Sequence, residues 1–485
     1  MAIPLAFQSA KALAARIRRG KLGSEELLDL LLARVEKYNP KLNAIIAIDL
    51  KTARKRARAA DAALAKGEIW GPLHGVPMTI KESYDVVGMP TTWGLTELKD
   101  NFPTRDALAV ARFRRAGVVL FGKTNVPTML GDWQTFNAIY GTTNNPWDVS
   151  RVPGGSSGGS AAALAAGLTG LEAGSDIGAS IRDPAHFCGV YGHKPTFGIC
   201  PTDGQALPGM VAAQDITVIG PLARSADDLE LALAVMAGPD EIEGRGIRLS
   251  LPACRKKSLR EFRVAVMLSA ETAEVDRSVQ DCIQAVADFA GKSRAKVSDT
   301  ARPEIDTAHA HHVFIQLLRA ATSRGQSDEV FARNFEAARK VDPSATDYRS
   351  WMLTGSTMSH RDWLQWNEMR HRIRHAWARF FEKYDVLLCP AGATPAFPHN
   401  QSGERWERMV SVNGKPQPST TQMFWAGFSG MAYLPSTVAP AGLSAEGLPV
   451  GVQIVGPQYA DLTCIRFAQL IEREYGGFVA PPGYE

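Results

Sequence analysis

The feature that most constrains the fold is a dense run of glycine and serine, PGGSSGGSAAALAAG, at residues 153–167. The run passes directly into small apolar residues, and the segment from Ser160 to Leu171 is rich in alanine. Such a segment is predicted to be a buried helix, because small side chains let neighbouring backbones approach closely. A flexible linker would instead stay polar and exposed on both sides. The run is therefore predicted to belong to an ordered core.

Two glycine-rich loop types fit the run less well. A phosphate loop needs GxxxxGK[ST], since the lysine neutralises the β- and γ-phosphates, but Ser160 stands where that lysine belongs. Residues 155–159 match the GxSxG pattern of a nucleophile elbow, which requires a buried strand directly upstream. The upstream residues, NNPWDVSRVP, have little apolar continuity. Neither loop type is favoured.

The rest of the chain alternates between helical and strand patterns, which is typical of an α/β protein. Helices are expected before about residue 70, with Ser24 as a candidate N-cap. Further segments are expected at the following positions: strands at 76–80, 262–268, 384–390 and 450–456, helices at 50–65 and 460–475, and a loose connector at 239–260. The simplest architecture is one large α/β domain with a helical elaboration.

Charge and cysteine usage argue against several classes of protein. The chain has 54 basic and 50 acidic residues, a net charge of +4, which is too balanced for a nucleic-acid footprint. Its basic clusters, Arg16–Lys21 and Lys51–Arg58, are predicted to be solvated helix faces. The six cysteines form no CxxC pair and fit free thiols in a reducing compartment. We find no secretory signal and no apolar run long enough to span a bilayer, so a cytoplasmic protein is expected.

Serine and lysine are the residues best placed to carry chemistry. A serine hydroxyl such as that of Ser156 or Ser180 is a poor nucleophile until a base takes its proton. Neither His186 nor His193 has an evident acid to orient it. A lysine can be the base where burial disfavours its charged form and lowers its pKa. Lys81, at the end of the apolar segment VPMTI, has such surroundings.

Several motifs in order along the chain resemble the amidase signature family of hydrolases. They are GVPMTIKES, GKTNVP, NNPWD, PGGSSGGSAAALAAG, GSDIGASIRDPAHFCGVYGHKPTFG and GLPVGVQIVGP. The resemblance extends from about residue 25 to 235 and from about 384 to the end. It implies an α/β fold with a large mixed β-sheet core covered on both faces by α-helices. It also implies a single domain, 1–485, with these parts: a signature core at about 65–235, a substrate-pocket elaboration at about 300–382, and C-terminal strands and helix at 384–485.

The resemblance also implies a Ser-cisSer-Lys catalytic triad. Ser180 corresponds to the nucleophile, Ser156 to the bridging serine after a cis peptide bond, and Lys81 to the general base. The backbone amides of Ile177, Gly178, Ala179 and Ser180 correspond to the oxyanion hole. An acyl-enzyme on Ser180 would form and then be hydrolysed by water.

Other residues near these positions are given supporting or competing roles. Ser157 is expected to support the site, and Asp176 and Arg182 are expected to form a hydrogen-bonded pair that fixes the nucleophile loop. Lys123, in GKTN, is a rival base with similar local sequence.

The chain departs from the family pattern at two positions. Ala179 stands where glycine is common, and an alanine at positive φ would cost about 1–2 kcal/mol. His193 stands where an apolar residue is usual. Neither change removes a member of the triad.

The histidines and tryptophans between residues 300 and 382 are predicted to have mainly structural roles. The cluster of His309, His311 and His312 is expected to lie on a helix surface, as is the pair His371 and His375, because the HExxH metal motif is absent. Core packing is the default for the tryptophans of this region, Trp351, Trp363, Trp366 and Trp377. One or two of these indoles are also expected to line the acyl pocket, which would suit an aromatic or bulky hydrophobic substrate.

The leading functional hypothesis is an amidase that hydrolyses an aryl, alkyl or related acyl amide to a carboxylic acid and an amine or ammonia. It requires no metal or other cofactor, and its partner is a small-molecule amide rather than nucleic acid or a membrane. The alternatives are the amidase subunit of a glutamine-dependent amidotransferase, an ester- or carbamate-cleaving relative, and a catalytically silent binding protein. A homodimer is common in the family.

Overall fold

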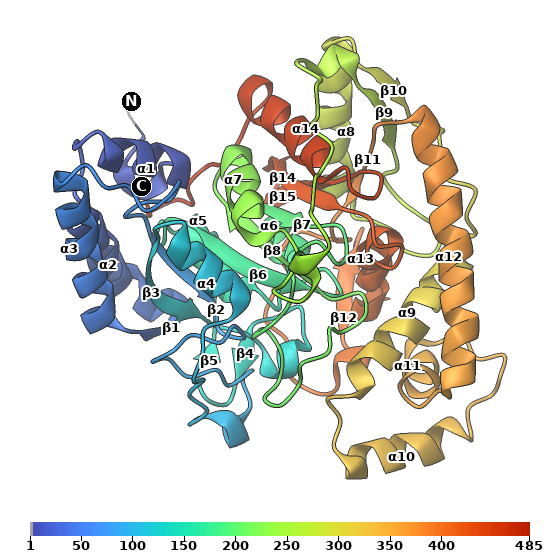
Figure 1. Cartoon of the computed structure of the whole chain (residues 1–485). Helices are drawn as coiled ribbons and strands as arrows, with labels where there is room; N and C mark the ends of the chain where they lie inside the picture. The colour runs from blue at the N-terminus through green and yellow to red at the C-terminus, as the bar shows by residue number, and fades with distance from the viewer. Residues whose placement is uncertain (1–2) are drawn as a thin grey trace.

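The computed structural model describes residues 3–485, and its core is an eight-stranded mixed β-sheet (Figure 1). The strand order is β10-β9-β11-β15-β14-β7-β8-β6. The pairs β10–β9 and β9–β11 are parallel, and the remaining neighbours are antiparallel. The strands are β6 (Glu172–Asp176), β7 (Tyr191–Lys194), β8 (Val218–Ala223), β9 (Arg263–Val266), β10 (Lys296–Ser298), β11 (Val386–Pro390), β14 (Ser436–Leu443) and β15 (Pro449–Val455).

Helices cover both faces of this sheet. Consecutive residues of a strand point to opposite faces, and β7 shows what each face meets. A side chain at Gly192 would touch Ala185 of α6, whereas the ring of the next residue, His193, bonds Asp461 at the start of α14. The expected α/β fold is therefore confirmed. The helices around the sheet are α5 (Gly158–Ala165), α6 (Arg182–Cys188), α7 (Ala226–Met236), α8 (Arg277–Lys292), α13 (Met423–Gly430) and α14 (Asp461–Glu474).

A second, three-stranded sheet contains the strand that ends in Lys81. Its order is β1-β3-β2, with β2 parallel to β3 and β1 antiparallel to it. The N-terminal helices lie beside this sheet on the left of Figure 1. The elements of this part are α1 (Ala10–Arg18), α2 (Ser24–Leu42), β1 (Ile45–Ile48), α3 (Leu50–Ala65), β2 (Pro77–Lys81), α4 (Leu108–Arg115) and β3 (Val119–Thr124).

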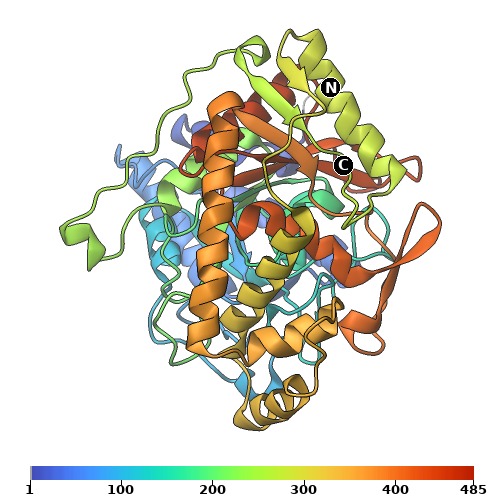
Figure 2. The same ribbon diagram turned by 90° about the vertical axis from the view of Figure 1, so that its right-hand side faces the viewer.

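The region from about 300 to 382 is helical, as expected, and forms one side of the molecule. Figure 2 shows the long helix α12 running along this side, in front of α9. The helices are α9 (Thr307–Ser323), α10 (Asp328–Ala338), α11 (Tyr348–Ser356) and α12 (His360–Lys383). Two small hairpins complete the fold: β4 (Phe136–Asn137) with β5 (Gly141–Thr142), and β12 (Met409–Val412) with β13 (Lys415–Pro418).

Two details of the predicted helices differ from the structure. Ser24 is not an N-cap but the first residue of α2, after the N-cap Gly23, whose amide donates to Glu26 Oε2 (3.0 Å). The Ser24 hydroxyl instead donates to the Gly75 carbonyl (2.7 Å). The alanine-rich helix α5 ends at Ala165 rather than near Leu171, because Gly167 takes a φ of +67°.

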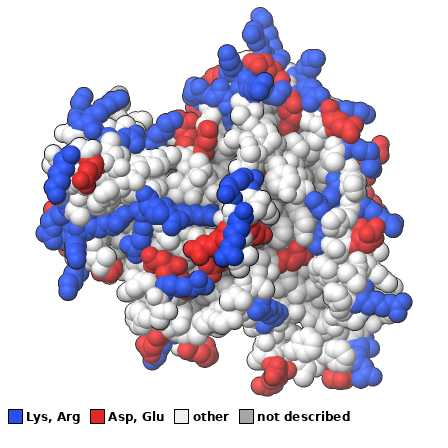
Figure 3. Space-filling model, in the orientation of Figure 1, with Lys and Arg blue, Asp and Glu red and all other residues white. Residues whose placement is uncertain are grey.

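Charged side chains are mixed over the face shown in Figure 3, with a concentration of Lys and Arg on its left. Two arginines of the Lys51–Arg58 cluster are paired: Arg54 contacts Asp29 (2.6 Å) and Arg58 contacts Glu25 (3.5 Å). The six cysteines are free thiols. Within residues 3–485, every helix is too short or too polar to cross a membrane.

Candidate active site

Lys81 lies at the centre of a cluster of serine hydroxyls. It is the last residue of β2, a strand whose side chains are all buried, and its own side chain is fully buried. Its Nζ donates to the hydroxyls of Ser156 (2.7 Å), Ser157 (3.0 Å) and Ser175 (3.0 Å). The strand therefore holds one amine against hydroxyls from the loop before α5 and from strand β6.

Burial lowers the pKa of Lys81 to about 7, because the charged form loses its hydration. Nearby Asp176 and Glu172 act in the opposite direction. Burial also raises the pKa of Glu172 to about 8, so this carboxyl is mostly neutral at pH 7. Near neutral pH the amine of Lys81 is therefore present in substantial amounts as a free base.

The loop before α5 brings Ser156 and Ser157 to this amine. The peptide bond between Gly155 and Ser156 is cis, and the Gly155 amide donates to Asp183 Oδ2 (3.1 Å). The Ser157 amide donates to the Ser180 carbonyl (3.1 Å), which ties this loop to the loop after β6. The glycine-serine run is thus buried and hydrogen-bonded on both sides.

The loop after β6 is held by a buried ion pair. Asp176 Oδ1 accepts from Arg182 Nη2 (2.9 Å), and Asp176 Oδ2 accepts from Arg182 Nε (3.0 Å). Burial would raise the pKa of Asp176, but the guanidinium and the backbone amides hold it below its ordinary value. Arg182 also donates to Gln453 Oε1 (2.8 Å) on β15 and to the Ala426 carbonyl (2.9 Å) on α13.

Ala179 has a left-handed backbone, with a φ of +80°, at the position where the family motif commonly has glycine. Its amide donates to Asp176 Oδ1 (3.0 Å). Among residues 3–485, no hydrogen-bond acceptor is found for the amides of Gly178 and Ser180. Of these three amides, those of Gly178 and Ser180 remain available to a ligand.

Lys123, the rival base, points away from the serines. Its Nζ donates to the Pro90 carbonyl (2.6 Å) and to Thr91 Oγ1 (2.8 Å). His193, the other departure from the family pattern, belongs to a buried network with Thr437 Oγ1 (2.9 Å) and Asp461 Oδ1 (3.1 Å).

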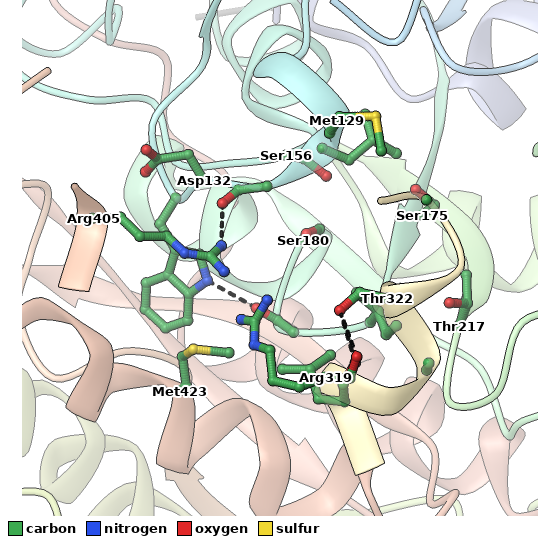
Figure 4. Close-up of a pocket in the computed structure, with 18 of the residues that line it drawn as sticks. Met129, Asp132, Ser156, Ser175, Ser180, Thr217, Arg319, Thr322, Arg405 and Met423 are labelled. Carbon is green, nitrogen blue, oxygen red and sulfur yellow. Dashed lines mark hydrogen bonds between the residues drawn. The ribbon is translucent and has the colours of Figure 1, made fainter. Parts of the chain in front are cut away.

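Ser180 opens into a cavity of about 1040 Å³ (Figure 4). Ser156, Ser175, Ile177 and Gly178 also line it. The rest of the wall comes from distant segments of the chain, within residues 93–134, 202–217, 318–326 and 397–423. A small molecule in this cavity can therefore reach the hydroxyls around Lys81.

The expectation that tryptophans of the helical elaboration line this cavity is wrong. Trp377 is fully buried and packs on Phe381 (ring centroids 5.5 Å apart) and Phe428 (4.9 Å). The indoles in the cavity wall are instead those of Trp93, Trp133 and Trp406. These residues lie outside the helical elaboration: Trp93 and Trp133 in loops, and Trp406 in a short 3₁₀ helix. Their sequence carries no signal of their position.

The histidine cluster of α9 is only partly on the surface. His309 is exposed, but His311 and His312 are partly buried, and the His312 ring stacks on Trp351 (4.2 Å). Burial lowers the pKa of both His311 and His312 to about 4. Within residues 3–485, no group of three histidine, cysteine or acidic side chains is arranged to hold a metal ion.

The sequence did not identify Ser175, which contacts Lys81, or Gln205, which contacts Ser175. Ser175 precedes Asp176 on β6, and its hydroxyl accepts from both Lys81 and Gln205 Nε2 (3.1 Å). Gln205 comes from a loop after β7 and also donates to Ser83 Oγ (3.1 Å). Because consecutive residues of a strand point to opposite faces, β6 directs Ser175 to the other side of the sheet from Asp176. Nothing in the sequence indicated Gln205.

Comparisons with known proteins identify the family of the chain. The family model described as Amidase matches residues 26–465. A glutamyl-tRNA(Gln) amidotransferase subunit from Anaeromyxobacter sp. (strain K) is 33% identical over 482 residues, with 95% of each chain covered. The indoleacetamide hydrolase of Bradyrhizobium diazoefficiens is 32% identical over 478 residues, covering 96% of this chain and 86% of that one.

A solved structure supports the fold. A bacterial aryl acylamidase of the amidase signature family superimposes with a TM-score of 0.82, covering 98% of this chain and 97% of that one. Because the two sequences are only 24% identical, this comparison supports the fold and nothing more specific. Together with the family match over most of the chain, these relatives show that the chain belongs to the amidase signature family and is an amidohydrolase acting on carbon–nitrogen amide bonds.

Proposed function

We propose that the chain hydrolyses the amide bond of a small acyl amide through an acyl-enzyme on Ser180. Ser180 is the nucleophile, Ser156 relays its proton, and Lys81 is the general base. The observation that carries this proposal is the 2.7 Å contact between Lys81 Nζ and Ser156 Oγ, buried beside the cavity that holds Ser180. A neutral lysine can accept a proton here, since its pKa is about 7.

The proton movements balance in both halves of the reaction. Lys81 takes the proton of Ser156 as Ser156 takes that of Ser180, and Ser180 Oγ attacks the amide carbon. The tetrahedral intermediate collapses when the reverse relay protonates the leaving nitrogen, which breaks the C–N bond. Water, deprotonated by the same relay, then attacks the ester carbon. The relay returns that proton to Ser180 Oγ as the C–O bond breaks and the carboxylic acid leaves.

The loop from Ile177 to Ser180 is proposed as the oxyanion hole. Because the Ala179 amide already donates to Asp176, the donors assigned to the oxyanion are the amides of Ile177, Gly178 and Ser180. Ala179 is given the role of shaping the turn, with Ser157, Asp176 and Arg182 in support. Each backbone donor contributes about 3 kcal/mol to transition-state stabilisation in comparable sites.

The substrate is proposed to be an aryl or bulky alkyl amide. A volume of about 1040 Å³ lies at the upper end of ordinary ligand sites, which span roughly 300–1,000 Å³. The three indoles in the wall suit an aromatic or apolar acyl group. An acyl ester or carbamate is the nearest alternative, because the same nucleophile attacks those carbonyl groups.

The proposal is tested by turnover of a panel of aryl and alkyl amides. Ser180→Ala and Lys81→Ala are each expected to lower kcat by at least about 1,000-fold. Surface variant Arg339→Met, whose side chain is 69% exposed, is the control. A fluorophosphonate is expected to label wild-type protein at Ser180 only. Unchanged turnover in either alanine variant would overturn the mechanism.

A second candidate is the amidase subunit of a glutamine-dependent amidotransferase, which the 33% identity to such a subunit favours. It predicts that the isolated chain hydrolyses glutamine and that partner proteins co-purify from the source cell. The stand-alone amidase predicts full turnover of acyl amides by the isolated chain. Parallel assays of glutamine and aryl amides therefore separate the two.

We also make proposals on the assembly, the cellular location and the domain organisation of the chain. On the family resemblance we propose a single-domain protein that forms a homodimer, which light scattering of the purified chain tests. On the six free thiols we propose a cytoplasmic location. Fractionation of the source cell, followed by detection of the chain, tests that location.

A further inference from the structure

The cavity wall contains a buried guanidinium group that has no acidic partner. Arg319 extends from α9 into the wall near Ser180 (Figure 4), and its side chain is 8% exposed. Its buried Nε has no hydrogen-bond partner in the described chain, residues 3–485. The ring of Tyr348 lies 5.4 Å from the guanidinium carbon. A neutral ring does not replace a counter-ion.

A second guanidinium, from Arg405, lies in the same wall. Arg405 donates to the Gly131 carbonyl and to the Tyr348 hydroxyl (3.3 Å), neither of which is an anion. Burial lowers the pKa of Arg319 to about 10, and the positive charge of Arg405 contributes to the same direction. Both guanidinium groups lie against Tyr348, which places the two like charges near each other.

The acidic side chains of the cavity wall are engaged elsewhere or exposed. Asp132 pairs with Arg408 (2.6 Å), and Asp215 pairs with Arg370 (2.7 Å). Glu404 is exposed to solvent. The wall beside the hydroxyl cluster thus carries positive charge that the protein itself does not neutralise.

Uncompensated charge is costly inside a protein, since a buried ion loses its hydration without gaining a partner. A guanidinium presents two parallel N–H groups that match the oxygens of a carboxylate. We propose that the aryl or alkyl amide substrate is acidic: it carries a carboxylate, which binds to Arg319 beside Arg405 while its amide carbon lies at Ser180. This inference rests on the proposed amidase function and specifies the substrate class of that same site.

The first experiment uses the wild-type enzyme. A chain-length series of dicarboxylic acid monoamides is compared with the methyl-ended neutral amides of the same lengths. The best acidic amide is expected to exceed its neutral match in kcat/KM by at least about tenfold, the value of a charged hydrogen bond. Equal or better turnover of the neutral amides at every length would overturn the inference and leave the proposed function intact.

The second experiment assigns the preference to Arg319. Arg319→Met is expected to lower the acidic-to-neutral ratio of kcat/KM by about 10- to 100-fold, mainly through KM. Arg319→Lys keeps the positive charge but not the two parallel N–H groups of the guanidinium, and it is expected to give an intermediate ratio. The matched control, Arg339→Met, removes an exposed arginine outside the cavity and is expected to keep the wild-type ratio. An unchanged ratio in Arg319→Met overturns the inference.

Labelling by a fluorophosphonate separates the possible failures. A labelled Arg319→Met protein has a formed hydroxyl cluster, so its substrate ratio is meaningful. If that variant does not fold, the wild-type comparison of acidic and neutral amides still decides. If wild-type protein neither reacts with the probe nor hydrolyses any amide, the proposed function itself has failed.

Discussion

The Lys81 amine makes the pH dependence of the reaction a property of one residue. Its pKa of about 7 arises from burial, and only the neutral amine can accept a proton from Ser156. We therefore expect kcat/KM to fall about tenfold per pH unit below 7 and to level off above it. Measurement of kcat/KM between roughly pH 5 and 9, with an uncharged amide, checks this expectation.

Lys123 supplies the control for that profile. Burial lowers its pKa to about 8, but its amine faces the Pro90 carbonyl instead of the serines. Lys123→Met is expected to keep the inflection near pH 7 even if its rate differs. An inflection that moves in this variant, or a flat profile in wild-type protein, would count against Lys81 as the base.

The buried pair of Asp176 and Arg182 is expected to contribute to the stability of the fold. Asp176→Asn leaves the guanidinium without its counter-ion in a site that is about 1% exposed. The free energy of unfolding is expected to fall by about 3–5 kcal/mol, measured by urea denaturation. Glu368→Gln breaks an exposed pair, with Arg372, and is expected to cost less than about 0.5 kcal/mol. Equal effects of the two substitutions would contradict the structural role of Asp176.

At the scale of elements, the sequence predicted individual helices and strands better than it predicted which strands pair with each other. The apolar run at 76–80 became β2 because five consecutive side chains are buried. Its membership in a separate three-stranded sheet was not predictable, since the pairing with β3 depends on contacts far away in sequence. The helix at 160–171 ended early because Gly167 is left-handed, a conformation that alanine-rich periodicity does not indicate.

The start of α5 shows why the glycines of the run are required. A side chain at Gly159 would press against the Asn125 amide nitrogen and lie 2.8 Å from the Ala44 carbonyl oxygen. Gly159→Ala is expected to destabilise the protein by at least about 2 kcal/mol, because backbone atoms cannot move aside.

The measurement is the urea midpoint of Gly159→Ala, compared with that of an alanine variant at a glycine in open space. Gly246, in the connector between α7 and β9, has open space within 4 Å of where an alanine methyl group would lie, and it is expected to tolerate alanine. If both variants unfold at the same urea concentration as wild-type protein, α5 does not require close backbone contact at its first turn.

At the scale of the whole molecule, the cavity is assembled from segments that only the fold brings together. The family motifs predicted Lys81, Ser156 and Ser180, because each lies in a short characteristic stretch. The tryptophans of α11 and α12 were predicted in part to line the cavity, yet they pack among the helices. Arg319, Arg405 and Met423 carry no local signal, since their roles depend on which loops face Ser180.

Met423, from the C-terminal part of the chain, limits the size of the substrate that fits beside the proposed catalytic serines. It begins α13, lines the cavity, and its Cε lies 3.7 Å from where a side chain on Gly178 would begin. Met423→Trp would fill the space beside the proposed oxyanion loop. We expect kcat/KM for a bulky aryl amide to fall about tenfold or more relative to a small aliphatic amide. Leu364→Trp, at a half-exposed position on α12 outside the cavity, is the control and should keep the wild-type ratio. A Met423→Trp enzyme with an unchanged preference would show that the acyl group lies elsewhere in the cavity.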